Sequence, residues 1–146
     1  MSVMAVMSGG VLIVLGTLLP WISTSSRAGD VAFSGIAGGG DGWITLPVGI
    51  GIIALAAFSM RGATEFNRAA VWLLSLIVFA VFWTDLGQVR RAVIGFESEA
   101  RGLGTADVGI GLWILALGAI LAFAMNIARP AARGPGTLPS LFRWRH

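Results

Sequence analysis

The sequence predicts an all-α fold, an integral membrane bundle of four transmembrane helices made of two tandem helical hairpins. Of the 146 residues, 56% are hydrophobic and 12% are charged, whereas about a quarter of the residues in a soluble domain are charged. Several apolar segments approach the roughly 20 residues that a membrane-spanning helix needs. They lie at residues 3–20, 44–60, 66–86 and 108–128. We therefore expect one four-helix transmembrane domain over residues 1–129, followed by a tail.

A repeated motif supports the two hairpins. Residues 45–51 have the sequence TLPVGIG and residues 105–111 have the sequence TADVGIG, so the copies differ only at their second and third positions. Each copy opens a long apolar run and follows a polar, glycine-rich segment. The repetition predicts that the second hairpin has the same architecture as the first.

Tryptophans mark the expected ends of the helices. The first helix is expected to be retained, because no basic residue precedes it as in a cleaved signal peptide. Pro20 ends this helix, and Trp21 follows at the place of an interfacial indole. Trp43 directly precedes the second predicted helix, and Trp83 lies near the end of the third. These three tryptophans are the predicted interfacial anchors.

Small residues are predicted to form the contacts between helices. Thr45 and Asp107 can cap the second and fourth helices, and Pro47 fits the first turn of the second. Behind each cap, a glycine and an alanine seven residues apart share one helix face, which lets a neighbouring backbone approach closely in lipid. The predicted packing residues are Gly49, Ala56, Gly109, Ala116, Gly111 and Gly118.

Two features, one at the end of the third predicted helix and one after it, each allow two interpretations. Asp85 falls in its last turn and is either a functional ionisable group or a residue near the interface that reaches water or Arg90. Residues 88–101 have an amphipathic pattern. That pattern fits a helix on the membrane surface or a lid packed on residues 22–42. The sequence does not decide whether the loops at residues 22–42 and 87–106 fold together.

Missing residue types exclude several chemistries. The chain has no cysteine, no lysine and no tyrosine, and its one histidine is His146. Disulfides, thiolate metal sites, lysine Schiff bases and bis-histidine haem sites are therefore excluded. We predict no catalytic, cofactor-binding or metal-binding residue, and hence no enzyme.

The arginines predict the topology. Of the ten arginines, six lie in the short turn at residues 61–68 or after residue 128. The positive-inside rule places this turn, both termini and the basic, Pro/Gly-rich tail at residues 130–146 in the cytoplasm. Basic and aromatic residues alternate at the end of the tail, a pattern that suits an anionic lipid surface or a partner protein. The predicted tail contacts are Phe142, Arg143, Trp144 and Arg145.

Glycine and tryptophan positions also carry a resemblance. Pro20-Trp21, residues 34–43, and residues 108–113 followed by Gly118 together resemble a loose group of small four-helix bacterial membrane proteins, frequent in high-GC Gram-positive bacteria. This group has no agreed function. The resemblance implies a multi-pass protein of the bacterial cytoplasmic (inner) membrane.

The expected function is that of a non-enzymatic accessory or structural subunit, packed against a larger membrane complex. Its partners would be other integral membrane proteins and lipids, not nucleic acid. The alternative is a small transporter or channel that forms its pathway by oligomerising. That alternative lacks polar residues at mid-bilayer, because Asp85, Asp107 and Asn126 all lie near predicted helix ends. The sequence identifies neither the partner nor the number of copies.

Overall fold

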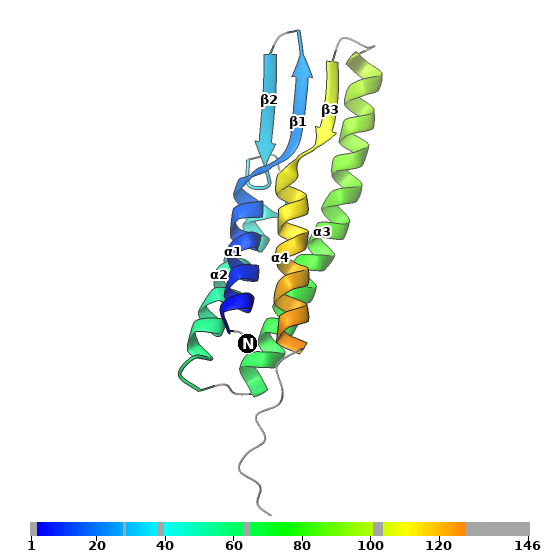
Figure 1. The fold of residues 1–146 in the computed structure, drawn as a ribbon. Coiled ribbons are helices and arrows are strands. Elements are labelled where there is room, and N and C mark those ends of the chain that lie inside the picture. The colour runs from blue at the N-terminus through cyan, green and yellow to red at the C-terminus, as the bar shows by residue number, and fades with distance from the viewer. Residues whose placement is uncertain (1–2, 28, 38–39, 63–64, 101–103, 128–146) are drawn as a thin grey trace, which may run out of the picture.

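The computed structural model describes residues 3–27, 29–37, 40–62, 65–100 and 104–127. Its elements follow one another as α1 (Val3–Leu18), β1 (Pro20–Ser26), β2 (Gly29–Ser34), α2 (Gly42–Phe58), α3 (Glu65–Ala100), β3 (Gly104–Val108) and α4 (Ile110–Ile127). Figure 1 shows two layers stacked along one long axis. The helical layer contains α1, α2, α4 and the first half of α3. The sheet layer contains the three strands and the second half of α3.

The chain passes between the layers several times. Strand β1 continues in the direction of α1, β2 returns towards α2, and α3 runs through both layers before β3 and α4 descend (Figure 1). The described ends of the chain, at α1 and α4, therefore lie together at the end of the helical layer that is farthest from the sheet.

The sheet is antiparallel with the order β2-β1-β3. Strand β1 pairs with β2 through Ile22 and Phe33, and with β3 through Ile22 and Val108. Side chains alternate between the two faces of a sheet. One face is therefore apolar and carries the buried Ala106, against which the second half of α3 packs. The other face is polar, with Ser25 donating a hydrogen bond to Asp30 over 2.6 Å.

The predicted all-α fold is wrong, because residues 20–34 and 104–108 form this sheet. The local signal was an alternation of β-branched or aromatic with polar residues, as at Ile22 and Thr24. This signal is short and is flanked by glycine-rich segments, which are typical of loops. The second partner of β1, β3, lies about eighty positions later in the sequence. The question about the two loops is answered: β1 of the first pairs with β3 of the second.

The predicted set of four transmembrane helices is also wrong. Among the described residues, two helical stretches are long and apolar enough to cross a membrane, Asn67–Glu99 and Ile110–Ile127. Helices α1 and α2 are apolar but shorter, with 16 and 17 residues. The amphipathic segment at residues 88–101 does not form a separate surface helix. It continues α3 to Ala100 and covers the sheet.

Glycines bring the helix backbones of the helical layer close together. Helix α1 lies between α4 and α2, and it makes its most extensive contact with α4. A Cβ added at Gly9 would lie 2.7 Å from the backbone nitrogen of Ala122 in α4, and one at Gly10 would lie 3.1 Å from the carbonyl oxygen of Gly49 in α2. Larger side chains at these points would force the helices apart.

Buried polar side chains join the helices at two depths. The hydroxyls of Thr17 and Thr45 are 2.9 Å apart and link α1 to α2. At the far end of the layer, Nδ2 of Asn126 donates to the backbone oxygen of Arg68 over 2.8 Å, which links α4 to α3. Within a densely apolar layer, such hydrogen bonds also fix the register of one helix against its neighbour.

Candidate functional site

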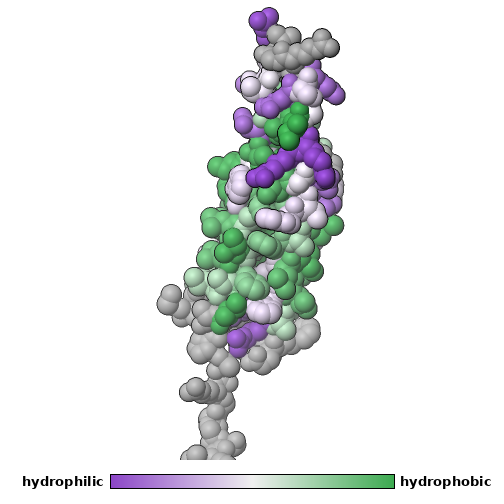
Figure 2. Space-filling view, turned by 90° about the vertical axis from the view of Figure 1, so that its right-hand side faces the viewer, coloured by the Kyte–Doolittle hydropathy of each residue, from purple (hydrophilic) through white to green (hydrophobic). Residues whose placement is uncertain are grey.

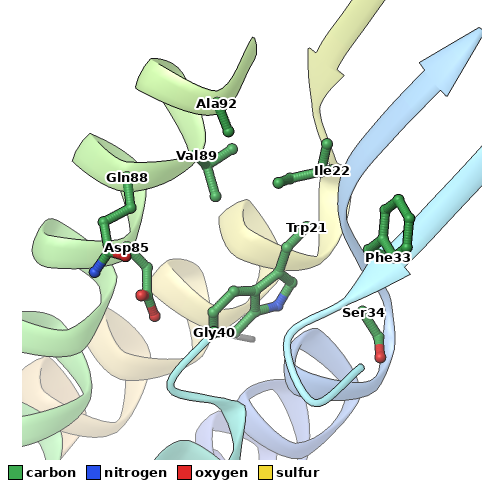
Figure 3. Close-up of a pocket in the computed structure, with 9 residues that line it drawn as sticks. All are labelled: Trp21, Ile22, Phe33, Ser34, Gly40, Asp85, Gln88, Val89 and Ala92. Carbon is green, nitrogen blue, oxygen red and sulfur yellow. The ribbon is translucent and has the colours of Figure 1, made fainter. Parts of the chain in front are cut away.

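A cavity of about 160 Å³ lies where the helical layer meets the sheet layer. Figure 3 shows that its walls come from α3 on one side and from β1, β2 and the loop before α2 on the other. The lining residues are Trp21, Ile22, Phe33, Ser34, Gly40, Asp85, Gln88, Val89 and Ala92. Most of these side chains are apolar, and the polar ones are few, as is usual in small-molecule sites.

Asp85 is the buried acid of this cavity. Its side chain is only 2% exposed, and its Oδ2 atom is buried with no hydrogen-bond partner in the described part of the chain. In Figure 3 the carboxyl group points from α3 towards the indole of Trp21. A second acid, Asp41, lies within electrostatic range of it. The reading in which Asp85 reaches water or Arg90 does not fit, since its carboxyl is shielded and Arg90 is exposed.

Trp21 forms the floor of the cavity and is held rigidly. It is 3% exposed, and its indole nitrogen donates to the backbone oxygen of Gly16 over 2.9 Å. A Cβ added at Gly40 would lie 2.8 Å from the indole ring, and Gly35 approaches the same ring even more closely. Gly35 and Gly40 are therefore explained by their close contact with the indole ring.

The three predicted anchors fall into two groups. Trp43 is 71% exposed and Trp83 is 67% exposed, so both indoles are available to lipid or to a partner. Trp21 is buried, and Gly35 and Gly40 pack against its indole, so this side chain is not exposed to lipid. The sequence placed it correctly at a helix end but gave no sign of the strand that continues beyond it.

The predicted packing residues lie at two kinds of contact. Gly111 and Gly118 of α4 face α1. A Cβ added at Gly111 would lie 2.7 Å from the backbone oxygen of Gly16, and one added at Gly118 would lie 2.7 Å from that of Gly9. Gly49 of α2 faces α1 too. Ala56 and Ala116 are buried.

Gly109 is different, because it precedes α4 and packs against the backbone of Pro20 and Trp21 in β1. Neither predicted cap forms. Thr45 lies inside α2, which begins at Gly42 after Asp41, and Asp107 lies in β3. The tail contacts predicted at residues 142–145 lie outside the described residues.

The sequence did not connect Asp85 with three other residues that line the cavity, namely Trp21, Gly40 and Gln88. Gln88 lies one turn after Asp85 on the same face of a helix, a spacing visible in the sequence. Trp21 and Gly40 belong to distant segments, and nothing local could have connected them with α3. Within the described ranges, no group of three or more His, Cys, Asp or Glu could hold a metal ion.

The chain matches no protein-family model, no curated protein sequence and no solved structure. The resemblance to small four-helix bacterial membrane proteins therefore stays a prediction.

Proposed function

We propose that the protein is a non-enzymatic accessory subunit of a larger membrane complex, and that it binds an extended segment of a partner protein along the free edge of β2. The observation that carries this proposal is the position of β2 at the end of the sheet, with no strand beyond it among the described residues. An edge strand presents unpaired backbone groups that readily pair with another chain.

The apolar surface of the helical layer supports a place in the membrane. Its α3 and α4 contain the two stretches long and apolar enough to cross a bilayer. All four helices also expose large apolar side chains, among them Met4, Leu15, Phe58, Leu73, Trp83 and Leu117. Figure 2 shows this green surface over the helical layer and purple residues gathered towards the sheet on the same face. Apolar side chains on all sides are typical of helices in lipid.

Charge supports an orientation. No charged residue lies between Arg68 and Asp85 in α3, and α4 has none. Arg61 and Arg68 lie at the end of the helical layer opposite the sheet, where the chain also ends its described course. The sequence carries six arginines at residues 61–68 and after residue 128, against four at residues 27, 90, 91 and 101. By the positive-inside rule this count favours an orientation in which the end with Arg61 and Arg68 faces the cytoplasm of a bacterial cell and the sheet lies on the other side of the cytoplasmic membrane.

The hydrogen-bond pattern identifies which residues of β2 offer their backbone. Gly109 donates to the backbone oxygen of Trp21 over 2.7 Å, so the odd-numbered residues of β1 bond towards β3. Bonding directions alternate along a strand, which assigns Ile22 and Thr24 to the pairing with Phe33 and Val31. The amide of Ala32, between them, must point outwards from the sheet. The exposed side chains of Val31 and Phe33 would add apolar contact to an incoming strand.

The matched pair Ala32→Pro and Ala32→Ser tests the proposal. Proline at this position removes the outward N–H and blocks a new strand, while the pairing of β2 with β1 is kept. We expect Ala32→Pro to lose its partner after mild detergent extraction and Ala32→Ser to retain it, with equal melting temperatures. The readout for these two variants is mass spectrometry of the proteins that co-purify with each. A third variant, Ala32→Cys, in a chain that has no other cysteine, identifies by crosslinking which of these proteins contacts β2.

The same cysteine tests the orientation. A membrane-impermeant thiol reagent should label Ala32→Cys in intact cells and should not label Gly62→Cys, which lies in the turn after α2. Labelling of Gly62→Cys alone would reverse the orientation. Retention of the partner by Ala32→Pro, or crosslinks only between copies of this chain, would refute the accessory role at this edge.

A further inference from the structure

The cavity beside Asp85 is lined by a buried carboxyl group whose Oδ2 atom accepts no hydrogen bond from the described residues. An acceptor buried without a hydrogen bond costs about 1–3 kcal/mol, and a buried charge costs more unless it is paired. Oδ2 of Asp85 has no hydrogen-bond partner among the described residues, and Asp85 is one of the residues that line the cavity. Figure 3 shows its carboxyl directed towards the indole of Trp21, another lining residue. This arrangement is unfavourable for the empty protein and would be relieved by a bound donor.

Asn126 is the other buried polar side chain with an unsatisfied oxygen among the described residues. It is as buried as Asp85, with 2% exposure, and its Nδ2 atom donates to the backbone oxygen of Arg68 and joins two helices, although its Oδ1 atom has no partner. Asp85 differs from Asn126 in being an acid. The backbone of Asp41 donates a hydrogen bond to its carboxyl group, whose Oδ2 atom has no partner among the described residues. The carboxyl is directed towards the indole of Trp21 (Figure 3).

We propose that this cavity binds a small primary ammonium ion with an apolar body, whose N–H groups donate to Oδ2 of Asp85 while its carbon atoms lie against Trp21. Two acids favour a cation, because Asp41 adds negative potential near Asp85. The indole adds a further attraction, since aromatic rings bind organic cations. The proposal is independent of the partner at the edge of β2.

The chemistry of the walls disfavours calcium and quaternary ammonium ions. Calcium takes six to eight oxygen ligands, whereas side-chain oxygens on the lining come only from Asp85, Gln88 and Ser34. A quaternary ammonium has no N–H and would leave Oδ2 unsatisfied. A primary ammonium supplies both the charge and the donors.

The volume limits the size of the ligand. A cavity of about 150 Å³ holds a molecule of the size of benzene, and this cavity measures about 160 Å³. A chain of about four carbons with a terminal ammonium therefore fits. We choose n-butylammonium as the probe. 1-Butanol has the same shape without charge, and tetramethylammonium has charge without donors.

The experiment uses the full chain in detergent at neutral pH, labelled with ¹⁵N at its tryptophans. Trp21 is recognised by the slowest hydrogen exchange, because its indole N–H is buried and bonded to Gly16. We expect n-butylammonium to shift this resonance saturably, and both control compounds to bind at least tenfold more weakly. Asp85→Asn should weaken binding at least tenfold, while Asp107→Asn, on the exposed face of β3, should not.

A second variant keeps the test decisive if Asp85→Asn alters the fold. Ala92 lines the cavity from α3, and Ala92→Leu should fill it and abolish the shift, with the other indole resonances unchanged. Three results would overturn the proposal: no saturable shift of Trp21, equal affinity for 1-butanol or tetramethylammonium, or unchanged affinity in Asp85→Asn.

Discussion

The two copies of the repeated motif have nearly the same sequence and different structures. Residues 45–51 lie entirely within α2, whereas residues 105–111 pass from β3 through Gly109 into α4. The copies differ at Leu46-Pro47 and Ala106-Asp107. Proline cannot donate a hydrogen bond to a sheet, so the first copy is unsuited to the strand that the second forms. The two copies differ at two residues, and one copy is helical where the other begins as a strand. The elements that each copy packs against differ as well.

The neighbours differ as much as the sequence does. The first copy packs beside α1, where Gly49 meets the methyl groups of Ile13 and Val14 at 2.9 and 3.0 Å from an added Cβ. The second copy pairs with β1, and Gly109 meets the backbone of Pro20. Equivalent glycines thus serve a helix contact in one case and a strand-to-helix junction in the other.

The largest expected difference between the copies is at these glycines. Gly109→Ala should lower the free energy of unfolding by about 3 kcal/mol, because the backbone that it meets cannot move aside. Gly49→Ala should cost about 1 kcal/mol, since side-chain methyls can yield and alanine favours the helix. SDS titration in mixed micelles, followed by circular dichroism, measures both. Equal losses would mean that the two glycines have the same role.

The second expected effect concerns the proline that only the first copy carries. Asp107 lies opposite Ser23 at a position whose N–H points towards β1. Asp107→Pro removes that donor and should cost about 2 kcal/mol. Asp107→Ser keeps the N–H and should cost less than about 0.5 kcal/mol, as a surface substitution does. The same titration distinguishes them, and similar stabilities would argue against the register of β3.

The smallest expected effect is at the first residue of each copy. Thr45 is buried and its hydroxyl lies 2.9 Å from that of Thr17, whereas Thr105 is exposed. Thr45→Val keeps the shape and loses this bond, which should cost about 1 kcal/mol. Thr105→Val should change stability by less than about 0.5 kcal/mol. If both valine variants match the unmodified protein in thermal melts, the hydrogen bond contributes nothing.

The comparison also shows how far the sequence could predict the fold. The predicted ends of α1, α2 and α4 differ from the observed ends by about two residues or fewer. This agreement follows because a long apolar run is a local signal. The first half of α3 was placed equally well. The expected end at residue 86 was wrong, since the helix continues to Ala100 by packing on strands that the sequence did not reveal.

The candidate site was predictable in one residue only. Asp85 drew attention because an ionisable group interrupts an apolar helix. Asp85 is buried beside a cavity and close to Trp21 only because segments more than forty positions apart in the sequence come together there. No periodicity connects such segments, and their meeting is decided by how the strands pair.

The sequence by itself determined where apolar helices lie and which residue types are absent, because composition and local periodicity are properties of short stretches. Only the tertiary structure decided that β1 pairs with β3, that the indole of Trp21 is enclosed rather than interfacial, and that Asp85 faces a cavity. The physical reason is that strand pairing and burial depend on the partner that a segment meets. Residues 105–111 form a strand and a helix start where residues 45–51 form a helix, since only the former lie beside β1.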